Sequence, residues 1–267
     1  MTKLQAVVFD WAGTMIDHGS LAPMGVFVKA FAEFGVEISV DEARGPMGMA
    51  KRDHIAALMA EPRIAAAWEE ARGKAPDDAE IDALYEVFVP MNTAVLGDYA
   101  ELIDGAVETV AALRARGLKI GSTTGYTRPM MEKLLPLAAE QGYAPDSLAC
   151  TGDTPAGRPT PLMMYKTFLD LDVWPAHAVV KVDDTEVGIA EGLNGGCWTV
   201  GVALTGNVFG LTPDETEALD PIEFEIRRAE AYGRLTRAGA HYVIDSVIQL
   251  PEILDEIEGA LARQDRP

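Results

Sequence analysis

The sequence is poor in cysteine and has no long apolar run, and each of these absences argues against a class of protein. Only two of its 267 residues are cysteines, Cys150 and Cys197, and they lie far apart in the chain. They form no metal or redox motif, so we expect two reduced core thiols and no disulfide framework. No apolar run is long enough to span a bilayer, and no signal peptide is visible before the first predicted strand. These absences favour a cytoplasmic protein.

Positive charge is also scarce. The chain has 22 Lys and Arg against 42 Asp and Glu, which gives a formal net charge of −20. This balance argues against non-specific binding to nucleic acid or to an anionic membrane. A site for an anionic substrate must therefore be made locally positive, by a metal, by a few placed cations or by helix N-termini.

What is present is an alternation of strands and helices, interrupted once. Val7-Val8-Phe9 is a short apolar run typical of a buried strand. Helical spacing then dominates as far as about Leu96, and strands return after Ile103. We therefore predict an α/β fold, a doubly wound parallel sheet, as a core of residues 1–20 and 99–267 with a helical cap of residues 21–98. The later strands are expected at 118–123, 148–151, 178–182, 198–202 and 242–244, and helices at 24–34, 47–59, 62–71, 77–91, 105–116, 128–140, 162–170, 186–192, 212–237 and 247–261.

Polar side chains follow four of the predicted strands. Asp10 follows the first, Thr124 the second, the loop containing Arg158 the third, and the pair Asp183-Asp184 the fourth. In an open α/β sheet, ligands bind outside the carboxyl ends of the strands, where these groups would converge. Each also has a purely structural interpretation: a helix N-cap for the threonine, helix-entry acids for the pair, and a surface loop for the arginine.

Together these residue types suit phosphoryl chemistry. Asp10 and Asp184 would form an oxygen site for Mg²⁺. The hydroxyl of Thr124 and the guanidinium of Arg158 can hold phosphoryl oxygens. A carboxylate beside Mg²⁺ can attack phosphorus and form an aspartyl-phosphate.

On these motifs, beginning with Asp10-x-x-Gly-Thr, the chain resembles the haloacid dehalogenase superfamily. The resemblance implies that Asp10 is the nucleophile, Thr124 binds phosphoryl oxygen, Arg158 has the basic role and Asp184 binds Mg²⁺. Phosphatases of that superfamily usually carry a second acid two residues after the nucleophile, where this chain has Ala12. The Ala12 side chain cannot transfer a proton, although its carbonyl can still face the metal.

The predicted cap contains the run Met47-Gly-Met-Ala-Lys51-Arg-Asp-His54. Lys51 and His54 are three residues apart and so share a helix face, with Met47 one turn earlier. Taken alone, Lys51 could be a solvated surface lysine. The apolar residues before it favour a desolvated amine of lowered pKa, which can form an imine with an aldehyde.

The segments DWAGT, PMGxxKxDHI, GSTTGYTR and GRPxP together resemble the phosphonatase branch of the superfamily. This resemblance implies Mg²⁺-dependent hydrolysis of the P–C bond of phosphonoacetaldehyde, with Lys51 as the imine-forming residue and Asp10 as the nucleophile. It further implies that His54 moves protons to and from Lys51, and that Tyr126 and Met47 line the site. A homodimer joined through the cap is also implied.

The fourth motif departs from the common pattern of this branch. Gly188 stands where a second acid is usual, and Asp183 or Glu186 could compensate for it. Two other functions stay open. The chain could be a phosphomonoester phosphatase of the same fold, or a non-catalytic protein that binds a phosphometabolite. The apolar cap residues Phe27, Phe31 and Trp68 suit either a dimer contact or packing inside the cap.

Overall fold

A computed structural model describes residues 3–267, and within them six parallel strands form one sheet in the order β3-β2-β1-β4-β5-β6. The predicted core residues 1–2 lie outside this range. Every strand predicted from the sequence is found, which confirms the α/β parallel-sheet fold. The strands are β1 (Ala6–Phe9), β2 (Lys119–Thr127), β3 (Ser147–Thr151), β4 (Val179–Asp183), β5 (Trp198–Val202) and β6 (Tyr242–Ile244).

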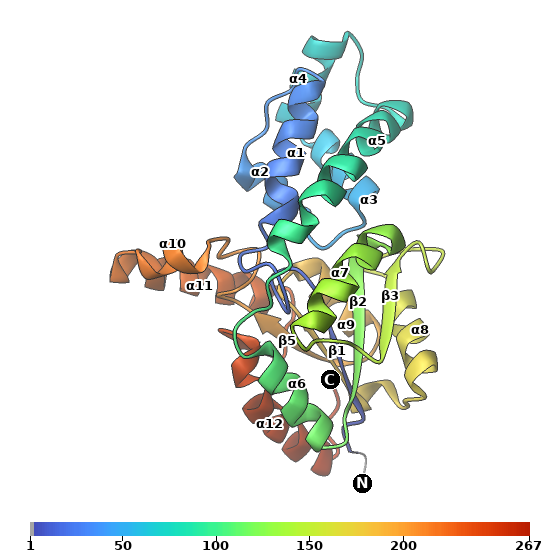
Figure 1. Cartoon of the computed structure of the whole chain (residues 1–267), viewed down its shortest axis with the longest axis vertical. Helices are drawn as coiled ribbons and strands as arrows, with labels where there is room; N and C mark the ends of the chain where they lie inside the picture. The colour runs from blue at the N-terminus through green and yellow to red at the C-terminus, as the bar shows by residue number, and fades with distance from the viewer. Residues whose placement is uncertain (1–2) are drawn as a thin grey trace.

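The sheet is covered by helices on both faces (Figure 1). Successive side chains of a strand point to opposite faces. Val7 and Phe9 accordingly pack in the cluster beneath α6, α7 and α12, whereas Ala6 and Val8 pack against α8 on the other face. Helices α9 and α11 cover that second face nearer β5. The core helices are α6 (Ala106–Ala115), α7 (Arg128–Glu140), α8 (Leu162–Leu171), α9 (Glu186–Asn194), α10 (Pro213–Glu217), α11 (Pro221–Arg237) and α12 (Leu250–Ala262).

The order of the strands reverses at β1. Phe9 pairs with Ser122 of β2 on one side and with Val182 of β4 on the other. The strands β2 and β3 are added on one side of β1, and β4, β5 and β6 are added on the other side. Such a switch point opens a crevice at the carboxyl ends of the strands. Asp10, the next residue after β1, lies at this crevice.

Five helices lie over that end of the sheet (Figure 1). They are α1 (Ala22–Glu33), α2 (Val40–Arg44), α3 (Lys51–Ala60), α4 (Pro62–Arg72) and α5 (Asp78–Val95). They enclose a hydrophobic cluster of their own, made only of residues between Met24 and Val95. This separate cluster supports a distinct cap, whose boundaries at residues 20 and 99 stay a prediction. Phe27, Phe31 and Trp68 are fully buried inside it, so they pack the cap and present no surface to a partner.

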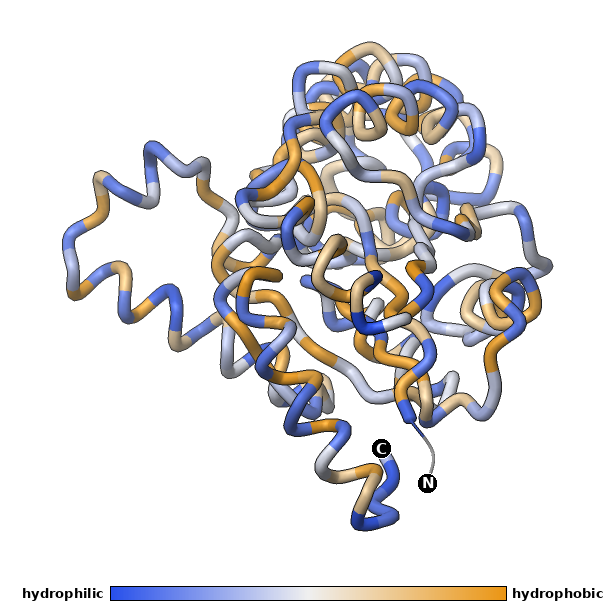
Figure 2. The backbone as a smooth tube through the Cα atoms, turned by 60° about the horizontal axis from the view of Figure 1, so that its bottom comes forward, coloured by the Kyte–Doolittle hydropathy of each residue, from blue (hydrophilic) through white to orange (hydrophobic). Residues whose placement is uncertain are grey.

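Two predicted helices have different limits in the structure. The helix expected at 47–59 begins only at Lys51, because the chain turns before it and Gly48 has a φ of +91°. The helix expected at 212–237 is two helices, because Asp220 caps the second one through the N–H of Ile222 and Pro221 has no N–H to continue the first. The pair α10–α11 reaches away from the body of the molecule (Figure 2).

Two further segments differ in extent. The second strand was expected to end at Thr123, but β2 runs on to Thr127, so Thr124 and Tyr126 lie within the strand. The segment at 247–261 starts with a short 3₁₀ turn, Val247–Gln249, before α12. Two more such turns are Leu96–Tyr99 and Ala176–Ala178. Within residues 3–267, no helix combines the length and the apolar character needed to cross a bilayer.

Candidate active site

The loop after β1 holds Asp10 against the end of β4. The Asp10 N–H donates to the carbonyl of Val182 over 2.9 Å, which continues the β1–β4 ladder by one bond. The chain then turns at Gly13, where φ is +79° and an added Cβ would lie 2.2 Å from an Asp184 carboxylate oxygen. Only glycine fits such a left-handed turn at that distance. The turn therefore brings the first and fourth strand ends together, as predicted.

The two acids after β4 have different surroundings. The Oδ1 atom of Asp183 accepts hydrogen bonds from the N–H and the hydroxyl of Thr185, at 3.0 and 2.7 Å. The Oδ2 atom of Asp184 accepts one from the N–H of Asn207 at 2.7 Å. Both carboxylates are fully buried. Asp183 is thus held within its own loop, while Asp184 is held by a distant segment.

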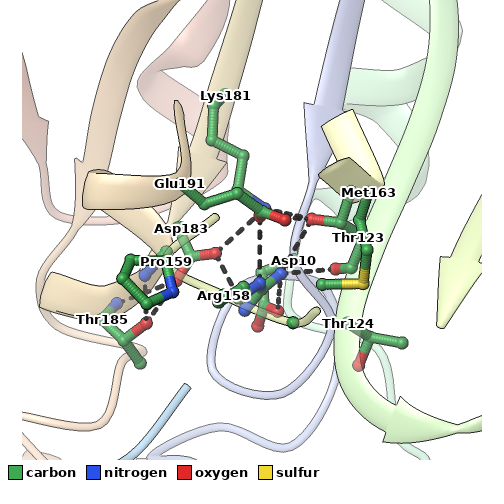
Figure 3. A network of polar contacts seen from close by, with 12 residues as sticks. Asp10, Thr123, Thr124, Arg158, Pro159, Met163, Lys181, Asp183, Thr185 and Glu191 are labelled. Carbon is green, nitrogen blue, oxygen red and sulfur yellow. Dashed lines mark hydrogen bonds and ion pairs between the residues drawn. The ribbon is translucent and has the colours of Figure 1, made fainter. Parts of the chain in front are cut away.

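Arg158 joins three buried carboxylates (Figure 3). Its guanidinium lies 2.8 Å from Asp10 Oδ1, 3.3 Å from Asp183 Oδ2 and 3.0 Å from Glu191 Oε2. It also donates to the carbonyl of Thr123 at 2.6 Å. Burial alone disfavours the charged guanidinium, but these carboxylates raise its pKa above the ordinary value. Arg158 is therefore a fixed cation of the site and not a surface loop residue.

The sequence analysis did not predict two charged residues of this network, Lys181 and Glu191. Lys181 Nζ lies 3.0 Å from Asp183 Oδ2, 3.3 Å from Glu191 Oε2 and 2.7 Å from the hydroxyl of Thr123. Lys181 and Glu191 are both fully buried. The available signal was the lysine itself, which interrupts an otherwise apolar buried strand, where an unpaired charge would be very costly. Glu191 gave no comparable signal, because it lies in an ordinary amphipathic helix.

The site carries an excess of buried negative charge. Four carboxylates share two cations: Asp10, Asp183, Asp184 and Glu191 against Arg158 and Lys181. Burial, followed by repulsion from Asp183, raises the pKa of Asp10 to about 6. Burial, followed by repulsion from Asp10 and Asp183, raises the pKa of Asp184 well above its ordinary value. This excess of buried carboxylates over cations, with the raised pKa values it causes, is what a bound divalent cation would relieve.

The donor atoms also suit a hard cation. Asp10, Asp183 and Asp184 each present a carboxylate oxygen, and these oxygens lie within 4.8 Å of one another. Asp183 uses its oxygens for Thr185, Arg158 and Lys181, whereas Asp10 Oδ2 has no such partner in the described part of the chain. The residues present therefore fit an oxygen-liganded metal such as Mg²⁺, with Asp10 and Asp184 as its nearest carboxylates.

Lys51 enters the site from the cap. It is the first residue of α3, its side chain is only 4% exposed, and its Nζ lies 5.2 Å from the ring centre of Tyr126 and 5.7 Å from that of Phe27. The sulfur of Met47 lies 3.8 Å from the amine. Burial lowers the Lys51 pKa to about 8, although Asp10 acts in the opposite direction. A usable fraction of the amine is therefore neutral near pH 7.

His54 lies behind Lys51 in the cap. Its Nε2 is 2.8 Å from the carbonyl of Ala43, which requires a proton on that nitrogen, and its ring stacks on Phe27 with centroids 4.0 Å apart. Its Nδ1 is buried, and among residues 3–267 it has no hydrogen-bond partner. Burial, and then the charge of Lys51, lower the His54 pKa well below its ordinary value. The ring is thus neutral, and the lone pair of Nδ1 has no partner among the described residues.

One small cavity of about 20 Å³ brings the predicted site residues together. A cavity of that size holds about one water molecule. The cap approaches the core closely beside it, since a Cβ on Gly125 would lie 2.8 Å from the carbonyl oxygen of Met49. Every predicted site residue except His54 lines it: Asp10, Ala12, Met47, Lys51, Thr124, Tyr126, Arg158 and Asp184.

The structure also distinguishes the two acids proposed to replace the one absent at Gly188. A Cβ on Gly188 would lie 1.9 Å from the carboxyl carbon of Asp183, so the Asp183 side chain occupies the space that a larger residue would need. Glu186 instead pairs with Arg234 at 2.6 Å. Of the two acids, it is therefore Asp183 whose carboxylate lies beside position 188.

Comparisons with known proteins agree with this geometry. The sequence model of the haloacid dehalogenase-like hydrolases matches residues 4–196. The chain is 58% identical to the phosphonoacetaldehyde hydrolase of Paraburkholderia phytofirmans over 267 residues, which is all of both chains. It is 47% identical to that of Klebsiella pneumoniae over 269 aligned residues, again the whole of both. A crystal structure of a phosphonoacetaldehyde hydrolase-like protein from Oleispira antarctica superposes with a TM-score of 0.97 at 43% identity, covering 99% of this chain and 96% of the other.

Proposed function

This chain belongs to the phosphonoacetaldehyde hydrolases of the haloacid dehalogenase-like hydrolase family, and we propose that it hydrolyses phosphonoacetaldehyde to acetaldehyde and phosphate. One observation carries the proposal. A buried lysine of pKa about 8 shares a small cavity with the carboxylate of Asp10, and Ala12 replaces the acid that a phosphatase would use.

The proposed reaction begins at Lys51. Its neutral amine attacks the aldehyde carbon and, with loss of water, forms a protonated imine. We assign to His54, which is neutral and has an unpartnered Nδ1 among the described residues, the uptake of the proton that the amine releases. The rings of Tyr126 and Phe27 stabilise the cationic nitrogen through their faces.

The P–C bond breaks in the next step. Asp10 attacks phosphorus through one of its two carboxylate oxygens, while the guanidinium of Arg158, 2.8 Å from Oδ1, keeps the carboxylate oriented. The electrons of the P–C bond enter the imine and give an enamine, so no free carbanion is expelled. Water then hydrolyses the aspartyl-phosphate, and the enamine is protonated on carbon and hydrolysed to acetaldehyde. Ala12 is consistent with this course, because the departing carbon needs no proton from that position.

Mg²⁺ held by Asp10 and Asp184, with the Ala12 carbonyl nearby, would neutralise phosphonate charge and lower the repulsion between the anionic substrate and the attacking carboxylate. Arg158 and the hydroxyl of Thr124 would bind the remaining phosphoryl oxygens. By family resemblance, we further propose a cytoplasmic homodimer.

Phosphate release from two substrates tests the proposal. We expect release from phosphonoacetaldehyde but not from an aryl phosphate, with loss of turnover in excess chelator and recovery on addition of Mg²⁺. Release from the aryl phosphate alone would identify a phosphatase, and release from neither would identify a non-catalytic binding protein. Asp10→Asn is the matched control, since it keeps the size of the side chain and removes the nucleophile.

A further inference from the structure

The side chain of a cap arginine, Arg44, forms all its direct hydrogen bonds with carbonyl and side-chain amide oxygens outside the cap helices. Arg44 is the last residue of α2 and its side chain is half-buried. Its Nη1 donates to the carbonyl of Gly19 at 2.9 Å and to that of Asn207 at 3.0 Å, and its Nη2 donates to that of Gly210 at 2.9 Å. Gly19 lies in the linker that leads into the cap, and residues 207 and 210 lie in the loop after β5.

The contact with Asn207 is reciprocal. Arg44 Nη1 also donates to the side-chain oxygen of Asn207 at 3.2 Å, and the side-chain amide of Asn207 donates back to the Arg44 carbonyl at 3.2 Å. Asn207 is only 1% exposed. Arg44 makes its direct hydrogen bonds to carbonyl and amide oxygens, and the nearby carboxylates of Asp17, Asp41 and Asp184 add a longer-range attraction to its charge. The pairing therefore depends on the directions of its N–H groups as well as on its charge.

Asn207 also binds the metal-site carboxylate. Its main-chain N–H is the 2.7 Å donor to Asp184 Oδ2. The loop can approach so closely because Gly206 precedes it, where a Cβ would lie 2.6 Å from the Cβ of Asp184. On the other side, a Cβ on Gly210 would lie 2.7 Å from the guanidinium carbon of Arg44. The loop of residues 206–210 is thus clamped between a cap arginine and a core carboxylate.

We infer that Arg44 is a positioning residue that couples closure of the cap to the orientation of Asp184 through Asn207. The Arg44 contacts to Asn207 and Gly210 cross from cap to core, so they exist only while the cap lies against the loop. The loop in turn fixes one oxygen of Asp184. Closure of the cap therefore completes both the cavity around Lys51 and the carboxylate geometry opposite it. The kinetic consequence rests on the proposed function, but the effect on Asp184 does not.

The first test measures Mg²⁺ binding without substrate, by calorimetric titration of the purified full chain. Arg44→Ala should weaken Mg²⁺ binding at least threefold, because the loop that orients Asp184 loses its anchor. Arg63→Ala is the matched control. Arg63 is another cap arginine, but it is exposed and bonds only to Glu42 and the Glu37 carbonyl, both within the cap. The Arg63→Ala variant should bind Mg²⁺ with the same affinity as the wild type.

The second test measures kinetics at saturating Mg²⁺. Arg44→Ala should lower kcat/KM for phosphonoacetaldehyde at least tenfold, and Arg44→Lys at least threefold, since a lysine keeps the charge but not the forked donor geometry. Arg44→Lys also serves as the test variant if Arg44→Ala does not fold. Arg63→Ala should stay within twofold of the wild type.

A double-mutant cycle tests the route through Asn207. Asn207→Ala removes the side-chain contacts with Arg44 but keeps the main-chain N–H that binds Asp184. If Arg44 acts through Asn207, Asn207→Ala should itself weaken Mg²⁺ binding, and the loss of Mg²⁺ affinity in the double variant should be smaller than the product of the two single losses. Fully additive losses would overturn the inference.

Two further results would overturn it. One is Mg²⁺ binding by Arg44→Ala that equals that of Arg63→Ala, even if the kinetics fall, because Arg44 would then hold the cap without affecting Asp184. The other is a wild-type protein that binds no Mg²⁺. A wild type that binds Mg²⁺ but does not cleave phosphonoacetaldehyde would refute the proposed function, and the binding measurements would still decide the role of Arg44.

Discussion

At the scale of single residues, the burial of Lys51 both creates its reactivity and costs stability. Its pKa falls from an ordinary value of 10.5 to about 8, chiefly through loss of water around the ammonium. Taking about 1.4 kcal/mol for each pH unit, burial of the charged form costs about 3 kcal/mol below pH 8. This cost disappears as the pH rises from 8 towards 10.5, since the folded protein then holds the neutral amine.

Replacement by an uncharged side chain of similar length should therefore stabilise the fold. We expect Lys51→Met to raise the free energy of unfolding at pH 7 by about 1–3 kcal/mol and to abolish turnover. Lys133→Met is the control, because Lys133 is exposed on α7 and its replacement should change stability by less than about 0.5 kcal/mol. Denaturant unfolding measures both. A destabilised Lys51→Met protein would contradict a desolvated lysine.

The same pKa predicts the pH dependence of the reaction. Only the neutral amine attacks an aldehyde, so kcat/KM should rise with pH through the range below 8 and level off above it. The measurement is a profile of kcat/KM from pH 6 to 9 at saturating Mg²⁺. A rate that falls from pH 7 to pH 8 would be incompatible with attack by Lys51.

The alanine after the nucleophile gives a third prediction at this scale. Ala12→Asp should not improve cleavage of the phosphonate, because the enamine route needs no acid there and the new carboxylate adds repulsion near Asp10 and Asp184. Steady-state phosphate release is sufficient to check it. A several-fold faster variant would mean that the absence of the acid has another explanation.

The residues that could be predicted from the sequence are those that follow strands or stand in an unusual local run. Asp10, Arg158 and Lys51 are of this kind, and they line one cavity. Glu191 and the Arg44–Asn207 pair could not be predicted, because their partners lie far away in the chain. Arg44 and Asn207 are 163 residues apart, and nothing local distinguishes either from a surface residue.

At the scale of elements, the junction of β4 with α9 pairs an acid at position 183 with a glycine at position 188. The Asp183 carboxylate lies where a side chain at position 188 would be, so the aspartate and the glycine depend on each other. The sequence left open whether Asp183 or Glu186 compensates for Gly188, and the three-dimensional contact relates Gly188 to Asp183.

Separate and combined substitutions should reveal this dependence. Gly188→Asp alone should be destabilising by about 1–3 kcal/mol through overpacking against Asp183. Adding Asp183→Gly should restore part of the loss, because it removes the obstructing carboxylate. Gly97→Asp is the control, since a Cβ there meets nothing within 4 Å. Thermal unfolding measures the stability of the wild type, Gly188→Asp, the double variant and Gly97→Asp. A double variant less stable than Gly188→Asp alone would refute the dependence.

The elements themselves were predictable where periodicity alone decides them. The helix α7 has the predicted limits of residues 128 and 140, and β5 those of residues 198 and 202. The predicted limits are wrong where a single contact determines where a helix begins or ends. The Asp220 cap divides the predicted helix at 212–237, and the turn around Gly48, which packs against Thr185, delays the start of α3.

At the scale of the whole molecule, the hydrophobic cluster of the cap and those around the sheet lie on opposite sides of one polar cavity. The cluster within the cap and the clusters around the sheet are separate, and residues from both sides line the cavity. A protein of net charge −20 can accept an anion there because Arg158, Lys51 and the cation that balances the acids concentrate positive charge at that point. This arrangement depends on bringing Lys51 of the cap over Asp10 of the core.

Trapping of the imine tests that arrangement most directly. Borohydride added together with phosphonoacetaldehyde should reduce the imine to a stable secondary amine, inactivate the enzyme and, by peptide mass spectrometry, place the adduct on Lys51. Lys51→Arg should form no adduct and release no phosphate, because its guanidinium is too basic to act as an amine nucleophile. An adduct on Lys29 or Lys181, or wild-type phosphate release by Lys51→Arg without any adduct, would contradict the account.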